Sequence, residues 1–200
     1  NKFDFIINCA AYTNVENAEI FKKKANLINN LSVYNLAKLS LEHNIQLVHI
    51  STDYVFDGNK KTPYLPSDKT KPCNYYGISK LQGEKSILSI NLPNSIIIRT
   101  SWLYSHHGHN FVTKIINHLQ NHKNLKIVNN QFGSPTRTKD LAFAILEILP
   151  NIKNLSTKVY HYSNIGQISW YDFAVEIAKS INPRAKIDQI SSESLNLKAK

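Results

Sequence analysis

The stretch Leu47-Val48-His49-Ile50-Ser51-Thr52-Asp53 joins an apolar run that predicts a buried strand directly to a set of polar residues. In open α/β sheets ligands bind outside the carboxyl ends of the strands, so we expect Thr52 to lie at such an edge. Farther along, Tyr76-Gly77-Ile78-Ser79-Lys80 places Tyr76 and Lys80 four positions apart on one face of a predicted helix. There the ammonium can lower the pKa of the phenol, so that the tyrosine exchanges a proton with a substrate oxygen near neutral pH. Taken alone, this pair also fits a surface aromatic ring lying over a lysine stem.

Apolar runs alternate with helical stretches along the chain, which is the pattern of a doubly wound α/β sheet. We predict strands at residues 5–7, 47–50, 95–100, 125–128 and 159–162. We predict two helical stretches within 15–43 and further helices at 76–90, 111–121, 138–149 and 170–181, the last one capped by Ser169. Residues 58–71 predict a polar loop. On the second helical stretch, the residues expected around the buried side are Leu31, Tyr34, Leu36, Leu39 and Leu41.

Five blocks of the sequence resemble the extended short-chain dehydrogenase/reductases and, within them, the dTDP-4-dehydrorhamnose reductases. The matching blocks are Asn8 to Glu19, Ser51 to Gly58, Pro72 to Glu84, Arg99 to Tyr104 and Gln131 to Thr136. They keep the order and spacing of that family from residue 4 to about residue 178. The resemblance implies an α/β fold, a partial Rossmann-like doubly wound parallel sheet with a smaller α/β substrate-binding lobe. It assigns residues 1–103 to the second part of the dinucleotide-binding domain and residues 104–200 to a mixed segment, the substrate-binding lobe interleaved with returns to the Rossmann domain.

The same resemblance implies a reaction, in which NADPH or NADH reduces the 4-keto group of dTDP-4-dehydro-6-deoxy-L-mannose to give dTDP-L-rhamnose for cell-surface polysaccharide. The catalytic residues that it implies are Thr52, Tyr76 and Lys80. The cofactor-binding residues that it implies are Ala11, Tyr12, Thr13, Tyr76 and Lys80. The substrate-binding residues that it implies are Thr52, Asp53, Tyr54, Trp102, Asn110, Gln131 and Arg137. Tyr76 would donate the proton while the nicotinamide gives hydride to the ketone carbon.

Several of these positions also have a purely structural interpretation. Asn29 matches an asparagine that the family keeps in a helix beside the site, but a capping or helix-bending amide is an equal alternative. Trp102 falls where an indole packs on the deoxysugar, and it also fits a core tryptophan. Arg137 could form a fork on the diphosphate, and it also fits a solvated loop arginine.

One feature of the family is missing from this sequence. Such reductases begin with a glycine-rich turn that holds the cofactor pyrophosphate at a helix N-terminus, and the six glycines here lie too far apart to form it. The resemblance places Phe3 to Asn8 at the fourth strand of the sheet and implies that the family continues beyond Ile190. We therefore expect the chain to be a fragment that lacks the N-terminal glycine-rich segment and the C-terminal end.

The formal net charge of +10 raises the question of nucleic-acid binding. The charge comes from lysines scattered along the chain, with no run beyond Lys22-Lys23-Lys24, whereas nucleic-acid recognition uses arginine forks and interleaved aromatic residues. We expect no nucleic-acid partner, but a mild attraction for an anionic nucleotide sugar. Short apolar runs and the lack of a charged-then-apolar leader predict no membrane span and a cytoplasmic protein. A homodimer is one option for its assembly.

No metal site is predicted. His106, His107 and His109 surround Gly108, but no carboxylate or cysteine stands at metal-ligand spacing, so a loop over the substrate mouth is the preferred interpretation. Mg²⁺ has no support in the sequence. Asp53 and Asp57 are expected in an extended segment and need not form a carboxylate pair.

Two alternatives to the reductase remain at this point. The first is a non-catalytic relative that binds a nucleotide or a partner, which loss of the glycine-rich turn would favour. The second is another nucleotide-sugar reductase, epimerase or dehydratase of the same superfamily. Retention of Thr52, Tyr76 and Lys80 together favours the reductase.

Overall fold

The structure, a computed structural model, describes residues 3–121 and 124–199. Within them the chain forms two compact units. The first unit contains the described residues up to Thr100, then Ile148–Tyr162, and the end of the chain from Leu197. The second unit contains Ser101–Glu147 and Ser163–Asn196.

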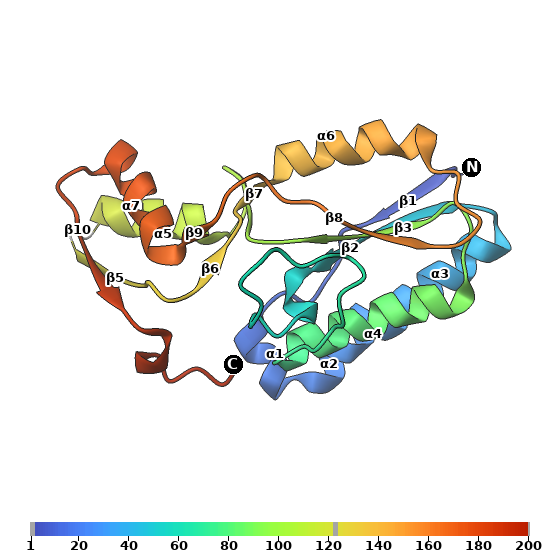
Figure 1. Cartoon of the computed structure of the whole chain (residues 1–200), viewed down its shortest axis with the longest axis horizontal. Helices are drawn as coiled ribbons and strands as arrows, with labels where there is room; N and C mark the ends of the chain where they lie inside the picture. The colour runs from blue at the N-terminus through green and yellow to red at the C-terminus, as the bar shows by residue number, and fades with distance from the viewer. Residues whose placement is uncertain (1–2, 122–123, 200) are drawn as a thin grey trace. The chain divides into compact units, whose positions relative to one another are not determined.

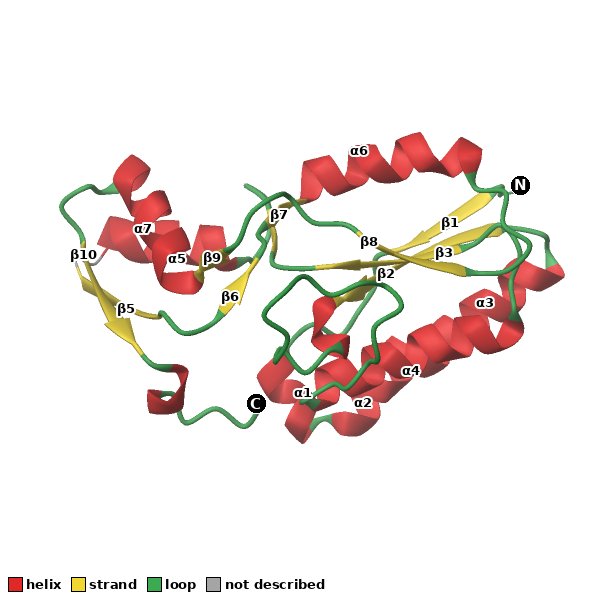
Figure 2. Ribbon diagram, in the orientation of Figure 1, coloured by secondary structure: helices red, strands yellow, loops and turns green. Residues whose placement is uncertain are grey.

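The first unit is built on a parallel four-stranded sheet (Figures 1 and 2). Its strands are β1 (Phe5–Asn8), β2 (Gln46–Thr52), β3 (Ile96–Thr100) and β8 (Lys158–His161), in the order β1-β2-β3-β8. Because all neighbours are parallel, their carboxyl ends share one edge of the sheet. The predicted α/β fold with a parallel, Rossmann-like sheet is therefore confirmed.

The helices of the first unit lie on one face of this sheet (Figure 1). They are α1 (Val15–Ile20), α2 (Lys22–Asn26), the π-helix η1 (Leu27–Leu31), α3 (Ser32–Glu42) and α4 (Tyr75–Ile90). Of these, α3 and α4 contact β2 and the others pack on α4. The polar loop predicted at 58–71 contains neither helix nor strand.

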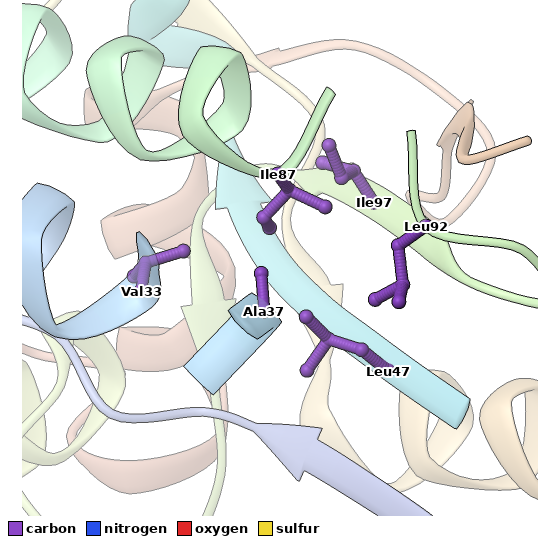
Figure 3. Packing of buried hydrophobic residues seen from close by; sticks show 6 residues of the cluster. All are labelled: Val33, Ala37, Leu47, Ile87, Leu92 and Ile97. Atoms are coloured by element: carbon purple, nitrogen blue, oxygen red, sulfur yellow. The ribbon is translucent and has the colours of Figure 1, made fainter. Parts of the chain in front are cut away.

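The main core of the first unit lies between α3, α4 and the sheet (Figure 3). Its buried members are Val33, Ala37, Leu47, Ile87, Leu92 and Ile97. Leu47 and Ile97 point to the helix-covered face, and since side chains alternate along a strand, residues two and four positions farther along point to that face too. This alternation fixes which polar side chains of β1, β2 and β3 meet α4 near the carboxyl edge.

The expected buried side of the second helical stretch was wrong. Val33, Ala37 and Ser40 are buried along α3, whereas Leu31, Tyr34, Leu39 and Leu41 are exposed; of the five predicted residues, Leu36 alone is half-buried. Small residues at the contact let α3 approach α4 closely, and this requirement outweighs side-chain hydrophobicity in choosing the face. The buried positions still follow the i, i+4, i+7 spacing of a helix.

Two glycines of α4 permit close backbone approach. A Cβ at Gly77 would lie 2.2 Å from the carbonyl oxygen of Tyr54, and a Cβ at Gly83 would lie 2.1 Å from that of Asn29. Any side chain at these positions would push the segment after β2, or η1, away from α4. The glycines therefore determine how closely α4 packs against both elements.

The second unit has its own core between α5 (Phe111–Asn121) and α7 (Trp170–Ile181). Beside them, β5 (Asn124–Val128) pairs in parallel with β10 (Lys186–Ile190), a strand that the sequence did not reveal. As predicted, Ser169 caps α7 by accepting the Asp172 N–H at 2.9 Å. The remaining elements are β4 (Leu103–Tyr104), β6 (Phe132–Gly133), β7 (Thr136–Arg137), α6 (Thr138–Ile148, its last residue in the first unit), β9 (Ile168–Ser169) and the 3-10 helix η4 (Ser192–Ser194).

In the described parts of the chain, none of the helices has both the length and the apolar character that crossing a bilayer requires.

Candidate active site

Helix α4 presents a row of polar side chains to the carboxyl edge of the sheet. Tyr76, Lys80 and Glu84 follow at four-residue intervals and so share one face of the helix. On β2, His49 and Ser51 project to the same side as Leu47. The two periodicities bring Lys80 to His49 and Glu84 to Ser51.

The phenol of Tyr76 lies beside Thr52, the last residue of β2. The pKa of Tyr76 is raised to about 12, above all by burial, while a hydrogen bond with the Thr52 hydroxyl opposes the rise. The hydroxyl of Thr52 also accepts the Tyr54 N–H at 3.2 Å and donates to the Asp53 carboxylate at 3.2 Å. The ring of Tyr54 stands edge-on to that of Tyr76, with centroids 5.4 Å apart. At this pKa the phenol holds its proton at neutral pH and is a weaker acid than a free tyrosine, so the proton is present but its transfer needs further stabilisation of the phenolate.

Lys80 is almost fully buried, with 2% of its surface exposed. Its Nζ donates to the Ile50 carbonyl oxygen at 2.6 Å and lies 3.3 Å from His49 Nε2. Burial lowers the pKa of Lys80 to about 8, against the opposing effects of Glu84 and Cys9. Burial is the largest influence on the pKa values of both groups here, and the Lys80 amine is directed at β2. The lowering of the Tyr76 pKa by Lys80 stays a prediction.

The loop that follows β1 is held by Asn29 of η1. The Asn29 side chain is fully buried; its Oδ1 accepts the Tyr12 N–H at 2.8 Å and its Nδ2 donates to the Tyr12 carbonyl at 3.1 Å. The same Nδ2 donates to the Ser79 hydroxyl at 2.9 Å, which ties the loop to α4 next to Lys80. Ala11 and Tyr12 are half-buried and Thr13 is exposed. Of the two interpretations of Asn29, the structure supports a side chain that positions this loop, and it lies on a π-helix, an element often found at functional sites.

Asp53 and Tyr54 start a short 3-10 turn, Asp53–Val55, and not the extended segment that was expected. The turn forms because the Thr52 hydroxyl caps the Tyr54 N–H. Burial raises the pKa of Asp53 to about 6, although hydrogen bonds from Thr52 and the backbone lower it. Asp57 faces away from this carboxylate and accepts the Tyr64 hydroxyl at 2.8 Å, so the two acids form no pair.

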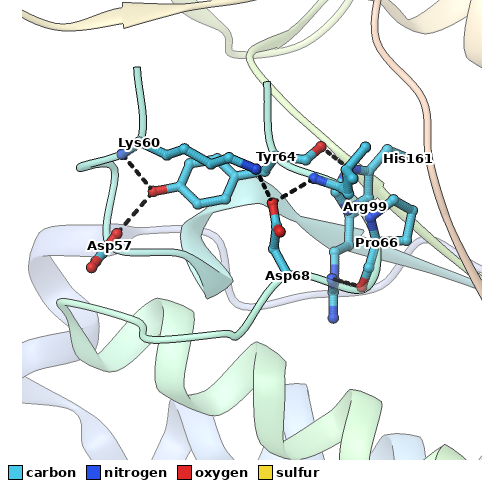
Figure 4. A network of polar contacts seen from close by, with 8 residues as sticks. Asp57, Lys60, Tyr64, Pro66, Asp68, Arg99 and His161 are labelled. Atoms are coloured by element: carbon cyan, nitrogen blue, oxygen red, sulfur yellow. Dashed lines mark hydrogen bonds and ion pairs between the residues drawn. The ribbon is translucent and has the colours of Figure 1, made fainter. Parts of the chain in front are cut away.

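A buried ion pair joins β3 to α4 next to the site. Arg99 of β3 donates to both carboxylate oxygens of Glu84, with Nη2 and Oε2 2.7 Å apart, and the Ser51 hydroxyl donates to the same carboxylate. Arg99 also donates to the Pro66 carbonyl at 3.2 Å and lies over the Phe56 ring. Figure 4 shows how the loop after β2 is tied to the strand ends: Arg99 donates to the Pro66 carbonyl, and His161 lies 3.1 Å from the Tyr64 carbonyl oxygen.

The candidate residues of the second unit have well-defined local roles. The Trp102 indole stacks on Trp170 with centroids 3.3 Å apart, and a Cβ at Gly133 would lie 2.4 Å from its ring. Asn110 uses its amide to close the loop before α5, donating to the Ser105 carbonyl at 2.8 Å and accepting the Thr113 N–H.

Gln131 and Arg137, the other two candidates of this unit, are both exposed. The backbone carbonyl of Gln131 accepts the Trp170 N–H at 3.3 Å. Arg137 makes a long 3.9 Å contact with Asp140, so its guanidinium has donors to offer an anion. The roles of Trp102, Asn110, Gln131 and Arg137 in binding stay predictions.

Residues 3–121 and 124–199 contain no group of three or more His, Cys, Asp or Glu side chains that could hold a metal ion. The rings of His106 and His107 have centroids 3.8 Å apart. Both residues, together with Gly108 and His109, lie on an irregular loop.

Comparison with known proteins agrees with this geometry. The family model described as the RmlD substrate binding domain matches residues 1–200. The spore coat polysaccharide biosynthesis protein SpsK of Bacillus subtilis is 40% identical over 95% of this chain and 65% of its own length. The dTDP-4-dehydrorhamnose reductase of Aggregatibacter actinomycetemcomitans is 39% identical over 88% of this chain and 60% of its own length.

A crystal structure of dTDP-4-dehydrorhamnose reductase from Bacillus anthracis, in complex with NADP, superposes with a TM-score of 0.93 at 36% identity. It aligns with 98% of this chain and 69% of that protein. The chain belongs to the RmlD family, that of the dTDP-4-dehydrorhamnose reductases. It spans less than two thirds of the length of the curated dTDP-4-dehydrorhamnose reductases that it matches.

Four residues of the site escaped the sequence analysis: Asn8, His49, Glu84 and Arg99. Each was part of a quoted block or an apolar run, but none was assigned a role. A usable signal was present for His49 and Arg99, since a polar residue inside an apolar strand must find a buried partner. The partner could not be named, because the contacts are set by how α4 crosses the sheet.

Proposed function

We propose that the protein containing this chain is an NAD(P)H-dependent reductase that converts the 4-keto group of dTDP-4-dehydro-6-deoxy-L-mannose to the alcohol of dTDP-L-rhamnose. The observation that carries the proposal is the grouping of the buried Thr52 and Lys80 with the half-buried Tyr76 at the carboxyl edge of a parallel sheet. Members of the family to which the chain belongs are named for this reduction.

The residues of the first unit suit the proton-transfer half of that reaction. Tyr76 carries its proton at neutral pH and donates it to the ketone oxygen as negative charge develops there. The Thr52 hydroxyl has a single proton, which in this step would turn from Asp53 to the same oxygen or to the phenol. Lys80, one turn from Tyr76 along α4, would stabilise the negative charge that develops on the phenol oxygen.

The same edge fits a nicotinamide dinucleotide. The donor set consists of hydroxyl and amine groups, and the backbone of the loop after β1 is held in place by Asn29 through both polar groups of Tyr12. We propose that Ala11, Tyr12 and Thr13 line the cofactor, with Tyr76 and Lys80 at its ribose. When bound, the reduced nicotinamide supplies the hydride.

We further propose that the nucleotide sugar contacts Asp53 and Tyr54 of the first unit and Trp102, Asn110, Gln131 and Arg137 of the second. Under this proposal the first unit is the dinucleotide-binding lobe and the second the substrate-binding lobe. A cytoplasmic location follows from the proposed reaction, since that compartment supplies reduced nicotinamide. A homodimer is the proposed assembly, and light scattering on the purified protein measures it.

The experiment is a turnover assay on the complete natural protein. Purified protein is mixed with NADPH or NADH and the 4-keto nucleotide sugar, and product formation is followed by chromatography and by the loss of reduced-nicotinamide absorbance. Formation of dTDP-L-rhamnose supports the proposal. Cofactor or nucleotide binding without turnover would instead support the non-catalytic alternative.

A second candidate substrate has support from one relative. A dTDP-4-keto-6-deoxy-D-glucose reductase of Streptomyces niveus is 39% identical over 84% of this chain. The two sugars differ in configuration and not in the group reduced, so the Thr52, Tyr76 and Lys80 chemistry serves both. The ratio of kcat/KM for the two nucleotide sugars decides between them.

A further inference from the structure

Trp102, just before β4, has a backbone conformation that a bulky side chain rarely adopts. Its φ is 45°, in the left-handed region that favours glycine. Such a conformation persists only where the surrounding structure fixes it, and residues held in this way cluster at ligand sites. The contacts of Trp102 therefore show which parts of the second unit hold it.

Two contacts fix the Trp102 indole. The ring of Trp170 stacks on it with centroids 3.3 Å and planes 6° apart, so that one face of the indole is covered. The backbone of Gly133 lies against the same indole, since a Cβ there would be 2.4 Å from Cε2 and 2.7 Å from Nε1. Trp102 as a whole is half-buried. The indole is thus held in one position, with part of its surface left open to a ligand.

The backbone of Trp102 is tied to the strand that carries Arg137. The Trp102 carbonyl accepts the Thr136 N–H at 3.2 Å. In the parallel pairing of β4 with β7, Leu103 lies opposite Thr136 and Tyr104 opposite Arg137. Each of these strands has only two residues. A change of conformation at Trp102 would therefore also displace β7 and Arg137.

Trp170 is itself anchored independently of Trp102. It is the first residue of α7, directly after the cap Ser169, and its N–H donates to the Gln131 carbonyl at 3.3 Å. The ring of Phe111, at the start of α5, has its centroid 4.3 Å from that of Trp170. Helices α5 and α7 pack together in the core of the second unit. The Trp170 ring is therefore a rigid support for the Trp102 indole.

We propose that Trp170 is a positioning residue for substrate binding: its ring holds Trp102 in the left-handed conformation and, through Trp102, sets the place of Arg137. The inference rests on the proposed function, in which Trp102 and Arg137 contact the nucleotide sugar. Contact between Trp170 and the substrate is not required. The effect on Trp102 and the effect on substrate affinity are measured separately.

The first measurement is fluorine NMR on the complete protein labelled with 5-fluorotryptophan, without substrate or cofactor. The signal of Trp102 is assigned by its loss in Trp102→Phe. We expect one sharp Trp102 signal in the natural protein, because the indole has one position. In Trp170→Leu we expect this signal to broaden or split as residue 102 leaves the left-handed conformation. A single sharp Trp102 signal in that variant would overturn the proposal.

Tyr171→Leu is the matched control for this measurement. Tyr171 follows Trp170 on α7, and neighbouring positions on a helix do not share a face. The Trp102 signal should therefore be the same in Tyr171→Leu as in the natural protein. Trp170→Phe keeps a smaller ring on α7 and serves in both measurements if Trp170→Leu does not fold.

The second measurement is calorimetry with dTDP-L-rhamnose, the product of the proposed reaction. We expect Trp170→Leu to weaken its binding about tenfold and Trp170→Phe, which retains an aromatic pair, about threefold. Tyr171→Leu should bind as the natural protein does. In the reductase assay Trp170→Leu should raise KM for the nucleotide sugar about tenfold while kcat stays within about threefold, since the variant leaves the reacting groups in place.

A double-mutant cycle shows whether Trp170 acts through Trp102. If it does, adding Trp170→Leu to Trp102→Leu should weaken the binding of dTDP-L-rhamnose by no more than about a further twofold. Fully additive losses of affinity would mean that Trp170 acts by another route, which overturns the proposal.

The calorimetry separates this proposal from the proposed function. Equal binding of dTDP-L-rhamnose by Trp170→Leu and the natural protein would overturn the role of Trp170 and leave the reductase assignment intact. A natural protein that does not bind this nucleotide sugar would overturn both.

Discussion

The side-chain amide of Asn29 pairs with the backbone of Tyr12 as a neighbouring strand would, accepting its N–H at 2.8 Å and donating to its carbonyl at 3.1 Å. The side chain of one buried residue thus makes the two hydrogen bonds that a paired strand would make, and it holds the loop after β1 beside α4. Because a backbone polar group buried without a partner is costly, this contact determines where the loop lies.

Asn29→Asp keeps the acceptor for the Tyr12 N–H but loses the donor to the Tyr12 carbonyl and to Ser79. We expect NADPH affinity, measured by calorimetry on the complete protein, to fall about tenfold, the equivalent of two lost hydrogen bonds at about 0.5–1 kcal/mol each. Asn30→Asp, on the same π-helix, loses its bond to Asn26 and should have little effect on affinity. Equal effects of the two variants would argue against the role of Asn29.

Gly83→Ala tests the close approach of α4 to η1. The new methyl would lie 2.1 Å from the Asn29 carbonyl oxygen, a backbone atom that can move only with its helix. We expect a loss of about 1–3 kcal/mol of unfolding free energy, measured by urea denaturation. Gly58→Ala meets no atom within 4 Å and should cost only the penalty of its positive φ of 72°, about 1 kcal/mol. A stable Gly83→Ala variant would mean that the helices separate readily.

Glu84→Gln removes one charge of the buried ion pair with Arg99. The remaining guanidinium would be buried without its counter-ion, and we expect a loss of about 3–5 kcal/mol in unfolding free energy. Glu176→Gln breaks an exposed pair with Lys179 and should cost at most about 1 kcal/mol. Similar losses of unfolding free energy in the two variants would show that burying an ion pair does not make the loss of one partner more destabilising.

Asp53 predicts a particular dependence of stability on pH. Its pKa is about 6 in the folded state against the ordinary 3.8, so between these values the folded state binds more protons than the unfolded state. Its contribution to stability therefore falls as the pH rises through that window. We expect Asp53→Asn to gain stability relative to the natural protein between about pH 4 and pH 6.

Asp68→Asn is the control for this measurement. The pKa of Asp68 is lowered, first by its bond to Lys60, so the effect of the substitution should have the opposite sign. Urea denaturation across the pH range measures both variants. A flat difference for Asp53→Asn would contradict the raised pKa.

The sequence predicted the order of the elements well, because periodicity and capping are local. The helices at 111–121 and 170–181 have their predicted bounds, and Ser169 caps as expected. β10 was missed, since its polar composition shows strand character only when it is paired with β5. The buried face of α3 was wrong because close packing with α4, and not hydrophobicity, selects Ala37 and Ser40.

The candidate site, too, has features that the sequence predicts and features that depend on tertiary packing. Thr52, Tyr76 and Lys80 could be predicted because strand ends and four-residue helical spacing are properties of the chain. The direction of the Tyr76 and Lys80 pKa shifts could not, since it depends on burial by residues distant in sequence. His49 meets Lys80 only after β2 and α4 have packed.

The most direct test of the account compares Tyr76→Phe with the natural protein in the reductase assay, using the complete chain, NADPH and the 4-keto nucleotide sugar. Tyr75→Phe, its neighbour on α4, is the matched control and should keep its activity. The account predicts that Tyr76→Phe lowers turnover about 100-fold or more, the range for a positioned proton donor, while cofactor affinity stays within about threefold. Near-natural turnover in Tyr76→Phe would contradict the central claim that this phenol supplies the proton.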